Sequence, residues 1–184
     1  KNNQKFIKVS SGDINNYPLL KKIGSNKKNV YLSTGMSNLK EIVKAIKILK
    51  LNGTKKKNIT IFHCTSAYPT PIEETNLNVI KTLKIYFGDN IGYSDHTNSI
   101  HIPAYAVLLG AKVIEKHITQ NNHDKGPDHS ASLNISNFKL MVKQIKKAEL
   151  SLGSSKKKLT KSDKINLKLA RRSIYAKKKI KKGE

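Results

Sequence analysis

A carboxylate and two imidazoles stand at the ends of predicted strands, and together these groups can bind a metal ion. Glu115 and His117 belong to the segment 112–117, where the alternation of side chains along a strand puts both on one face and Lys116 on the other. His96 ends the predicted strand before it. Two imidazoles and a carboxylate suit Mn²⁺ or a similar octahedral cation that keeps open positions for substrate and water. A pair of hydrogen-bonded structural histidines is the alternative.

A second group of residues combines one ammonium group with several hydroxyls. Its members, all near the ends of predicted strands, are Lys8, Ser11, Ser33 and Ser94. The ammonium supplies positive charge, and the hydroxyls can bond phosphate oxygens. We therefore expect a phosphate dianion here, although a single serine at a strand end is more often a solvated loop residue.

Two further residues are candidates for contacts with a sugar. Asp128 lies in Gly126-Pro127-Asp128-His129, where Gly and Pro favour a defined turn that would hold the carboxylate against sugar hydroxyls. A simple Asx turn is the alternative. Tyr68 begins the proline-rich segment 68–71 and could pack on a sugar face or merely cover the end of the fold.

The elements that must position these residues are five strand-helix units. Short β-branched runs alternate with longer segments of helical periodicity, which predicts a parallel sheet. Expected strands cover residues 6–9, 30–33, 59–64, 91–94 and 112–117. Expected helices lie near residues 17–23, from a Ser37 cap to about 52, at 77–87 and 100–109, and from Asn134 or Ser136 to about 152.

The placement of polar residues favours a barrel over a doubly wound sheet. Every predicted strand ends in groups able to do chemistry, and in a (β/α)8 barrel all such ends ring one face. An open sheet would concentrate them at one switch point. No glycine-rich phosphate loop follows any of these strands, so a dinucleotide-binding fold is disfavoured. We expect an α/β fold, a partial TIM barrel over residues 1–153.

The composition narrows the possible partners and compartments. The net charge is +24, but all the basic residues except Arg171 and Arg172 are Lys, scattered along predicted helix faces, so we disfavour a nucleic-acid groove. Cys64 is the single cysteine, which gives no sign of an oxidising compartment. No apolar run approaches a membrane span or a signal peptide, and the cytoplasm is the default expectation.

The last part of the sequence differs in character from the first. Residues 154–170 begin with Ser and Lys and read as a linker, and residues 171–176 read as a strand that begins a separate small domain over 171–184. The chain starts without Met and stops before that domain is complete. We therefore interpret it as a fragment, expected to be inactive and poorly folded on its own because open sheet edges stay unpaired.

Seven motifs, in order and spacing, resemble the N-acetylneuraminate synthase family, which includes legionaminic acid, pseudaminic acid and spore-coat polysaccharide relatives. They are KVSSGD with NYPL at 8–19, LSTGM at 32–36, HCTSAYPTP at 63–71, GYSDHT at 92–97, GA through EKH at 110–117, GPDH at 126–129, and RSI to KGE at 172–184. The resemblance covers nearly the whole chain.

The resemblance implies a (β/α)8 barrel, here strands four to eight, followed by a small antifreeze-like domain that reaches into the partner's active site in a homodimer. It implies that a divalent metal, most simply Mn²⁺ with Mg²⁺ or Co²⁺ as alternatives, polarises an open-chain N-acylated amino sugar. Phosphoenolpyruvate then attacks through C3, water adds at C2, and phosphate leaves by C–O cleavage. The implied residues are His96 and His117 for the metal, Lys8, Ser11, Ser33 and Ser94 for phosphate, Ser66 for the carboxylate side, Tyr68 and Asp128 for the sugar, and Asp13 or Glu115 for the water or a proton.

Two positions depart from the sialic acid synthase pattern. Asp13 stands where that pattern has Glu, and Ser66 stands where it has Asn. The reaction class is unaffected, but the identity of the sugar is left open. Another phosphoenolpyruvate-dependent synthase of 3-deoxy sugar acids and a basic nucleic-acid-binding module are the alternatives.

Overall fold

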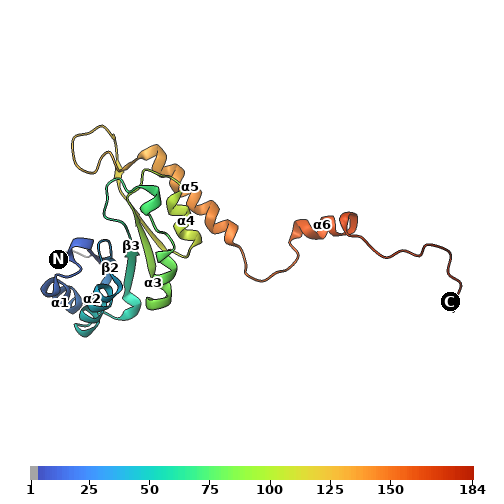
Figure 1. Cartoon of the computed structure of the whole chain (residues 1–184), viewed down its shortest axis with the longest axis horizontal. Helices are drawn as coiled ribbons and strands as arrows, with labels where there is room; N and C mark the ends of the chain where they lie inside the picture. Colours follow the sequence, from blue (N-terminus) through green and yellow to red (C-terminus); the bar gives the residue numbers. More distant parts are fainter. Residues whose placement is uncertain (1–3) are drawn as a thin grey trace. The chain divides into compact units, whose positions relative to one another are not determined.

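The computed structural model describes residues 4–184, in two compact units, Lys1–Leu152 and Gly153–Glu184. The strands are β1 (Phe6–Val9), β2 (Asn29–Ser33), β3 (Ile59–His63), β4 (Ile91–Asp95), β5 (Val113–Lys116), β6 (Ile118–Thr119) and β7 (Leu133–Asn134). The α-helices are α1 (Tyr17–Ser25), α2 (Leu39–Leu51), α3 (Val79–Phe87), α4 (Ile102–Leu108), α5 (Ile135–Leu152) and α6 (Lys161–Ala170). Figure 1 follows these elements along the chain.

The main sheet consists of five parallel strands in the order β1-β2-β3-β4-β5. Each strand pairs with the next one in the sequence, so the order contains no switch point of the kind that a doubly wound sheet requires. The choice that the sequence left between the two architectures is thereby settled in favour of a barrel. The five strands expected for the barrel are confirmed, with each boundary within one residue.

The sheet is strongly curled, as a contact between side chains of its two outermost strands shows. Lys8 on β1 and Glu115 on β5 form an ion pair with an Nζ–Oε2 distance of 2.5 Å. In a flat sheet of this many strands the outer two would lie about 19 Å apart. The five units therefore form part of a barrel wall with an inner and an outer face.

The inner face has an aromatic layer below the strand ends. Phe6 stacks on Tyr31 with ring centroids 4.6 Å apart, and Tyr31 contacts Phe62 at 5.3 Å. On β4, Gly92 leaves the space that Phe62 fills, since a Cβ there would lie 2.8 Å from the ring. This layer separates the polar strand ends from the lower part of the barrel interior.

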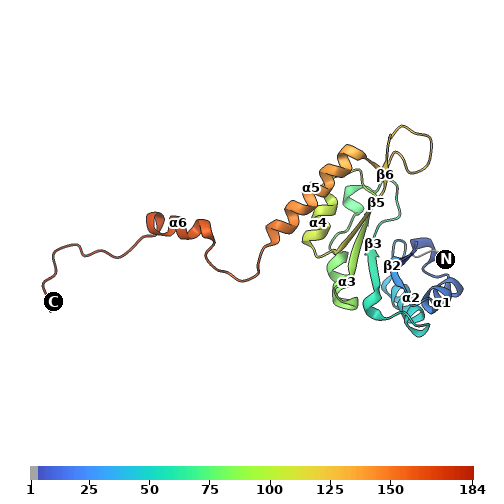
Figure 2. The ribbon, with the colours of Figure 1, turned by 180° about the vertical axis from the view of Figure 1, so that it is seen from behind.

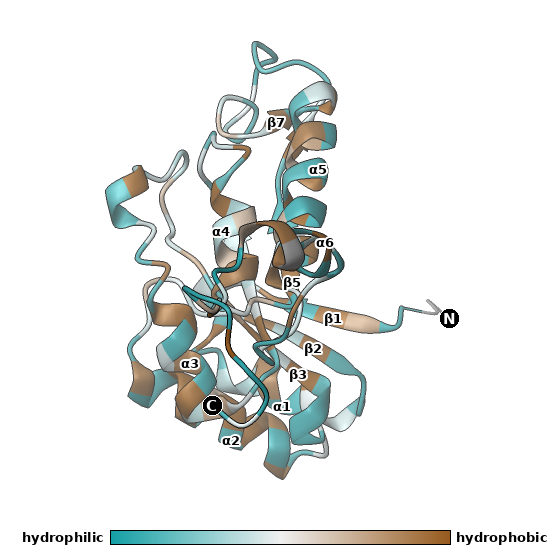
Figure 3. Cartoon of the chain, turned by 90° about the vertical axis from the view of Figure 1, so that its right-hand side faces the viewer, coloured by the Kyte–Doolittle hydropathy of each residue, from teal (hydrophilic) through white to brown (hydrophobic). Residues whose placement is uncertain are grey.

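The outer face packs against the helices. Apolar residues of β1 to β4 and of helices α1 to α4 form the main core, whose fully buried members include Leu20, Val30, Leu49 and Ile91. In Figure 3, β1, β2 and β3 lie side by side and α1, α2 and α3 gather on one side of them. Figure 2 shows α4 alongside α5. This packing fixes the outer side of each strand and so aims the alternate residues inward.

Two local expectations need correction. Asn38, not Ser37, caps α2: its Oδ1 accepts the Glu41 amide at 3.1 Å, and the Glu41 carboxylate accepts the Asn38 amide at 2.8 Å. This capping box pairs two otherwise free amides, whereas the Ser37 hydroxyl turns back to the Gly35 carbonyl. The second correction concerns β6 and β7, a short parallel pair that the sequence did not suggest.

The second unit, Gly153–Glu184, contains α6 within the stretch expected to be a linker, and a Thr160–Asp163 capping box begins this helix. The strand expected over residues 171–176 is not formed. A strand needs a neighbour for its backbone groups, and this unit offers none; Ile174 and Tyr175 are exposed. No helix found within residues 4–184 is both long and apolar enough to cross a membrane.

The Asn38 cap leads to a stability prediction. Asn38→Ala should lower the free energy of unfolding by about 0.5–2 kcal/mol, because it removes the acceptor for the Glu41 amide. Ser37→Ala is the matched control and should cost clearly less. Urea denaturation followed by circular dichroism measures both variants. An equal or larger loss for Ser37→Ala would contradict the assignment of the cap.

Candidate active site

A cavity of about 280 Å³ lies at the carboxyl ends of the barrel strands, where the expected functional residues meet. It is lined by Lys8, Ser10, Ser11, Gly12, Ser33, Met36, Cys64, Ser66, Tyr68, Ser94, His96, Glu115 and His117. Nine of these are residues singled out in the sequence; Asp13 and Asp128 do not line it. The prediction that the polar strand ends converge on one face is therefore confirmed.

The Glu115 carboxylate is the centre of the hydrogen bonding in this cavity. Lys8 donates to both of its oxygens, at 2.6 and 2.5 Å, and Ser94 donates to Oε1 at 2.7 Å. Partial burial by itself would raise the pKa of Glu115, but the hydrogen bonds from Lys8 and Ser94 and the lysine charge outweigh it and lower the pKa. Glu115 is thus held as a carboxylate against two of the groups expected to bind phosphate.

The Ser33 hydroxyl has no partner. Among the described residues, its Oγ is the buried side-chain polar atom that makes no hydrogen bond. A hydroxyl in this condition costs about 1–3 kcal/mol of lost solvation. Since Ser33 lines the cavity beside Lys8 and Ser94, an oxygen-rich ligand would satisfy it.

A cysteine and a glycine complete this side of the cavity. The Gly35 amide donates to Ser11 Oγ at 3.1 Å and to Cys64 Sγ at 3.2 Å, and these two side-chain atoms are 3.3 Å apart. A Cβ at Gly35 would lie 2.4 Å from Ser66 Oγ, so the three side chains can close around the backbone only because residue 35 is Gly. Sequence reasoning did not select Cys64 as a site residue, although it is the last residue of its expected strand, which is the same signal that identified Ser94.

The two histidines face each other across the other side of the cavity. The ring centroids of His96 and His117 are 5.5 Å apart, with the planes nearly perpendicular. Tyr68 covers both, with its ring 4.1 Å from that of His96 and 5.6 Å from that of His117. The expectation that His96 and His117 lie close together is confirmed.

The hydrogen bonds of His96 determine which of its nitrogens is free. Nδ1 lies 2.7 Å from the Thr65 carbonyl, which can only accept, so Nδ1 carries the proton. Burial lowers the pKa of His96, which keeps the ring neutral and leaves a lone pair on Nε2. Nε2 faces Ser94 Oγ at 3.2 Å, but the serine proton is donated to Glu115. A neutral imidazole whose far nitrogen is fixed by a carbonyl is the usual form of a metal-ligating histidine.

The donor set fits a metal ion that keeps open positions. Within residues 4–184 no three His, Cys, Asp or Glu side chains converge closely enough to surround a cation. His96 and His117 would therefore supply two ligands, and water and substrate oxygens the others. The imidazole nitrogens and oxygen ligands suit Mn²⁺ and similar ions.

Asp128 lies beyond the cavity, on the loop between β6 and β7. Its Oδ2 is 3.6 Å from His117 Nδ1. The two residues line an adjacent cavity of about 360 Å³ with Pro127, His129 and Ser132. The loop is held by its own backbone: Asn122 donates to the carbonyls of His129 and Ser132, at 2.9 and 2.6 Å. A polar recess thus continues the cavity on the side of His117.

Asp13 lies away from the reacting groups. Its carboxylate accepts Ser10 Oγ at 2.8 Å and Asn16 Nδ2 at 3.4 Å, which ties the turn after β1 to the start of α1. Of the two acids considered from the sequence, Glu115 is the one that lines the cavity.

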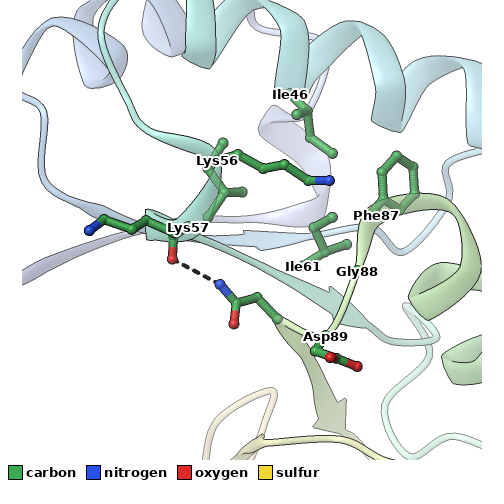
Figure 4. A pocket seen from close by; sticks show the side chains of 9 residues that line it. Ile46, Lys56, Lys57, Ile61, Phe87, Gly88 and Asp89 are labelled. Atoms are coloured by element: carbon green, nitrogen blue, oxygen red, sulfur yellow. Dashed lines mark hydrogen bonds between the residues drawn. The ribbon is translucent and has the colours of Figure 1, made fainter.

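A separate cavity of about 370 Å³ lies at the opposite end of β3. Its walls include Ile46, Ile61 and Phe87, and Figure 4 shows the Lys57 carbonyl at its edge, which accepts the Asn90 amide at 2.8 Å. None of the strand-end residues discussed above lines it. It is therefore distinct from the candidate site.

The fold and the strand-end site define part of a (β/α)8 barrel with a polar cavity at the carboxyl ends of its strands, and the sequence shows the family to which it belongs. Residues 1–157 match the NeuB family. This chain belongs to the NeuB family.

Individual relatives agree with this assignment. The chain is 48% identical over 180 residues to the N,N'-diacetyllegionaminic acid synthase of Campylobacter jejuni, covering 98% of this chain and 54% of that protein. It is 39% identical to the human N-acetylneuraminate-9-phosphate synthase, covering 98% of this chain and 50% of that protein. The crystal structure of an N-acetylneuraminic acid synthetase from Leptospira borgpetersenii superposes with a TM-score of 0.82 at 32% identity, over 90% of this chain and 57% of that one. The chain thus spans about half the length of these curated relatives.

The tautomer of His96 can be tested directly. At pH 7 the ring should be neutral and protonated at Nδ1, because burial lowers its pKa and the Thr65 carbonyl requires a donor. Since the folded-state pKa is lowered, His96 should gain its second proton only at a pH below that of a free histidine. Long-range proton–nitrogen correlation NMR, with the signal assigned by its loss in His96→Gln, measures both properties. A charged ring or an Nε2 proton at pH 7 would refute the assignment.

Proposed function

We propose that the protein containing this chain condenses phosphoenolpyruvate with an N-acylated amino sugar to give a nonulosonic acid and inorganic phosphate. Family membership supports this proposal, as do the names of relatives, which are synthases of N,N'-diacetyllegionaminic acid, pseudaminic acid and N-acetylneuraminate-9-phosphate. The observation that carries it is the single strand-end cavity in which Lys8, Ser33 and Ser94 lie beside the His96–His117 pair.

Phosphate binding would exchange partners within the cavity. Lys8 and Ser94 both donate hydrogen bonds to Glu115. A phosphate dianion would compete for the same ammonium and hydroxyl, and the Ser33 hydroxyl would gain its missing partner. Ser11 would add a hydroxyl from the turn after β1, and Ser66 would lie at the carboxylate side of phosphoenolpyruvate. The exchange would leave the Glu115 carboxylate with fewer hydrogen bonds.

His96 and His117 would hold a divalent cation, which we propose to be Mn²⁺, with Mg²⁺ or Co²⁺ as alternatives. When bound, this cation supplies Lewis acidity toward an aldehyde oxygen. The role of this chain is to hold the two imidazoles in place and to keep His96 as a neutral ligand through the Thr65 carbonyl. Tyr68 would exclude water from the imidazoles and pack against the sugar, and Asp128 would accept hydrogen bonds from sugar hydroxyls.

The reaction needs a bond between C3 of phosphoenolpyruvate and the aldehyde carbon, with a proton delivered to the aldehyde oxygen. Water then adds at the cationic C2 with loss of one proton. The resulting C2 hydroxyl loses its proton to form the C2 ketone, as the C2–O bond to phosphate breaks with its electron pair leaving on phosphate. Glu115 lines the cavity and, released from Lys8, would accept the proton of that water. Asp13 would act indirectly, by fixing the turn that carries Ser11.

We extend the proposal to the assembly of the whole protein. Residues 171–184 would begin an antifreeze-like domain, joined through residues 154–170 and exchanged within a homodimer. Both substrates are small molecules, and neither nucleic acid nor membrane is required. The reaction would take place in the cytoplasm, where a lone thiol such as that of Cys64 stays reduced.

The metal assignment predicts the behaviour of two histidine variants. His96→Ala and His117→Ala in the full-length protein should each abolish Mn²⁺-dependent release of phosphate from phosphoenolpyruvate, because each removes one of two protein ligands. The matched control is His101→Ala, since His101 is exposed at the start of α4. Phosphate release is measured with and without Mn²⁺. Full activity in both site variants would exclude the proposed ligands.

The division of the cavity into a phosphate side and a sugar side predicts opposite kinetic effects. Lys8→Ala removes a charge-assisted hydrogen bond worth roughly 1.5–3 kcal/mol and should raise the KM for phosphoenolpyruvate about tenfold to 150-fold. The KM for the sugar should change much less. Asp128→Ala should show the converse pattern, because Asp128 lies in the recess beyond His117.

Lys112→Ala is the control for Lys8→Ala. Lys112 is an exposed lysine just before β5, at the opposite end of the barrel from the cavity, and its loss should leave both constants unchanged. Equal effects of Lys8→Ala and Asp128→Ala on the two substrates would contradict the division.

A further inference from the structure

A buried ion pair joins β4 and β5 on the opposite face from the cavity. Asp95 and Lys116 are partners in the register of the two strands. Lys116 Nζ lies 2.6 Å from Asp95 Oδ2, and the two side chains are 1% and 0% exposed. Neither Asp95 nor Lys116 lines the two cavities at the strand ends, so the pair is separate from the groups that would contact a substrate.

The hydrogen bonds of this pair are nearly saturated. Asp95 Oδ1 accepts Tyr93 Oη at 3.2 Å and the Thr97 amide at 3.1 Å, and Oδ2 accepts Thr97 Oγ1 at 3.1 Å as well as Lys116. Lys116 also donates to the Thr97 carbonyl. Each group therefore has one defined position relative to the backbone of both strands.

A pair of this kind is a poor means of gaining stability. Removing two charges from water costs about as much as their attraction returns, and apolar replacements of both partners are often neutral or stabilising. Buried ion pairs can instead specify one arrangement of the elements that they join. The relevant question is which arrangement this pair specifies.

The pair lies at the last rung of the sheet before the two histidines. The β4–β5 ladder ends at Asp95 and Lys116. His96 and His117 are the residues that directly follow the two strands. Beyond this rung no backbone pairing between β4 and β5 holds the imidazoles at their centroid separation of 5.5 Å. The ion pair and its bonds to Thr97 link the two strands at this last rung, and the Ser94–Glu115 hydrogen bond links them one rung earlier.

We propose that Asp95 and Lys116 are a positioning pair, which sets the spacing and orientation of His96 and His117 for one divalent cation. This inference rests on the metal assignment in the proposed function. It predicts that neutralising the pair weakens metal binding even when the protein stays folded. Both imidazoles would still be present, but their spacing and orientation would no longer be fixed.

The test is the double variant Asp95→Asn with Lys116→Met in the full-length protein. Asn keeps an acceptor for the Thr97 amide and Met keeps the unbranched stem of Lys, so no charge is left buried alone. The thermal unfolding midpoint should stay close to that of the parent protein. The dissociation constant for Mn²⁺, measured by electron paramagnetic resonance of the free ion, should rise about 10- to 100-fold, as when residues that orient metal ligands are lost.

The matched control makes the same replacements at a more exposed ion pair, as Lys84→Met with Asp89→Asn, where the groups are 3.4 Å apart and lie at the amino end of β4, away from the site. Mn²⁺ affinity should not change there. In the site double variant, kcat should fall by more than the KM for phosphoenolpyruvate rises, since the phosphate ligands are untouched. A folded double variant that binds Mn²⁺ within about twofold of the parent overturns the positioning role.

A second variant covers the case in which the double variant does not fold. Tyr93→Phe keeps both charges and the ring but removes one donor to Asp95, and it should weaken Mn²⁺ binding about threefold, less than the full value of a hydrogen bond to a charged group. Unchanged affinity in Tyr93→Phe then overturns the inference. A parent protein that does not bind Mn²⁺ contradicts the proposed function itself, which is a separate result from equal binding by parent and variant.

Discussion

The contact between Lys8 and Glu115 is the interaction on which the site depends. It joins the first and last strands of the sheet, residues separated by 107 positions in the sequence. Such a contact is possible only because the sheet curls, and the curl follows from aromatic packing of Phe6, Tyr31 and Phe62 on the inside and from the helices on the outside. The polar strand ends then face one small cavity instead of being spread along a sheet edge.

The same contact links charge to substrate binding. Glu115 accepts hydrogen bonds from Lys8 and Ser94, so these groups are not left as an unpaired charge and hydroxyl in a half-buried position. Ser33 is left without a partner, and the Nε2 lone pair of His96 faces a serine whose proton is donated elsewhere. In the proposed reaction these two unsatisfied positions correspond to the two ligand types, a phosphate and a cation.

Much of the fold and of the candidate site could be predicted from the sequence, and the failures have physical causes. Strands such as Ile59–His63 were predictable because β-branched and aromatic residues occur in short runs between helical segments. Convergence of Ser33, Ser94 and Glu115 followed from the rule that parallel strand ends share one face.

Partners across the fold were harder to predict than positions along it. Lys116 was correctly assigned to the face opposite His117, but nothing local to it indicates that Asp95, 21 residues earlier, would receive its ammonium. The bond between Asn38 and Glu41 was detectable as a capping box, but the neighbouring Ser37 is also a favourable cap residue and was chosen in its place. The expected strand over residues 171–176 failed because strand formation requires a partner that local composition cannot supply.

The most direct test of the central claim is the fate of the bridging oxygen of phosphoenolpyruvate. The full-length protein is incubated with Mn²⁺, an N-acylated amino sugar, and phosphoenolpyruvate labelled with oxygen-18 between C2 and phosphorus, and the released phosphate is analysed by mass spectrometry. Because water is proposed to attack C2 while Lys8 and the serines hold the phosphate, the label should appear in inorganic phosphate, and its release should require the sugar. Unlabelled phosphate, or release that is independent of the sugar, would contradict the account.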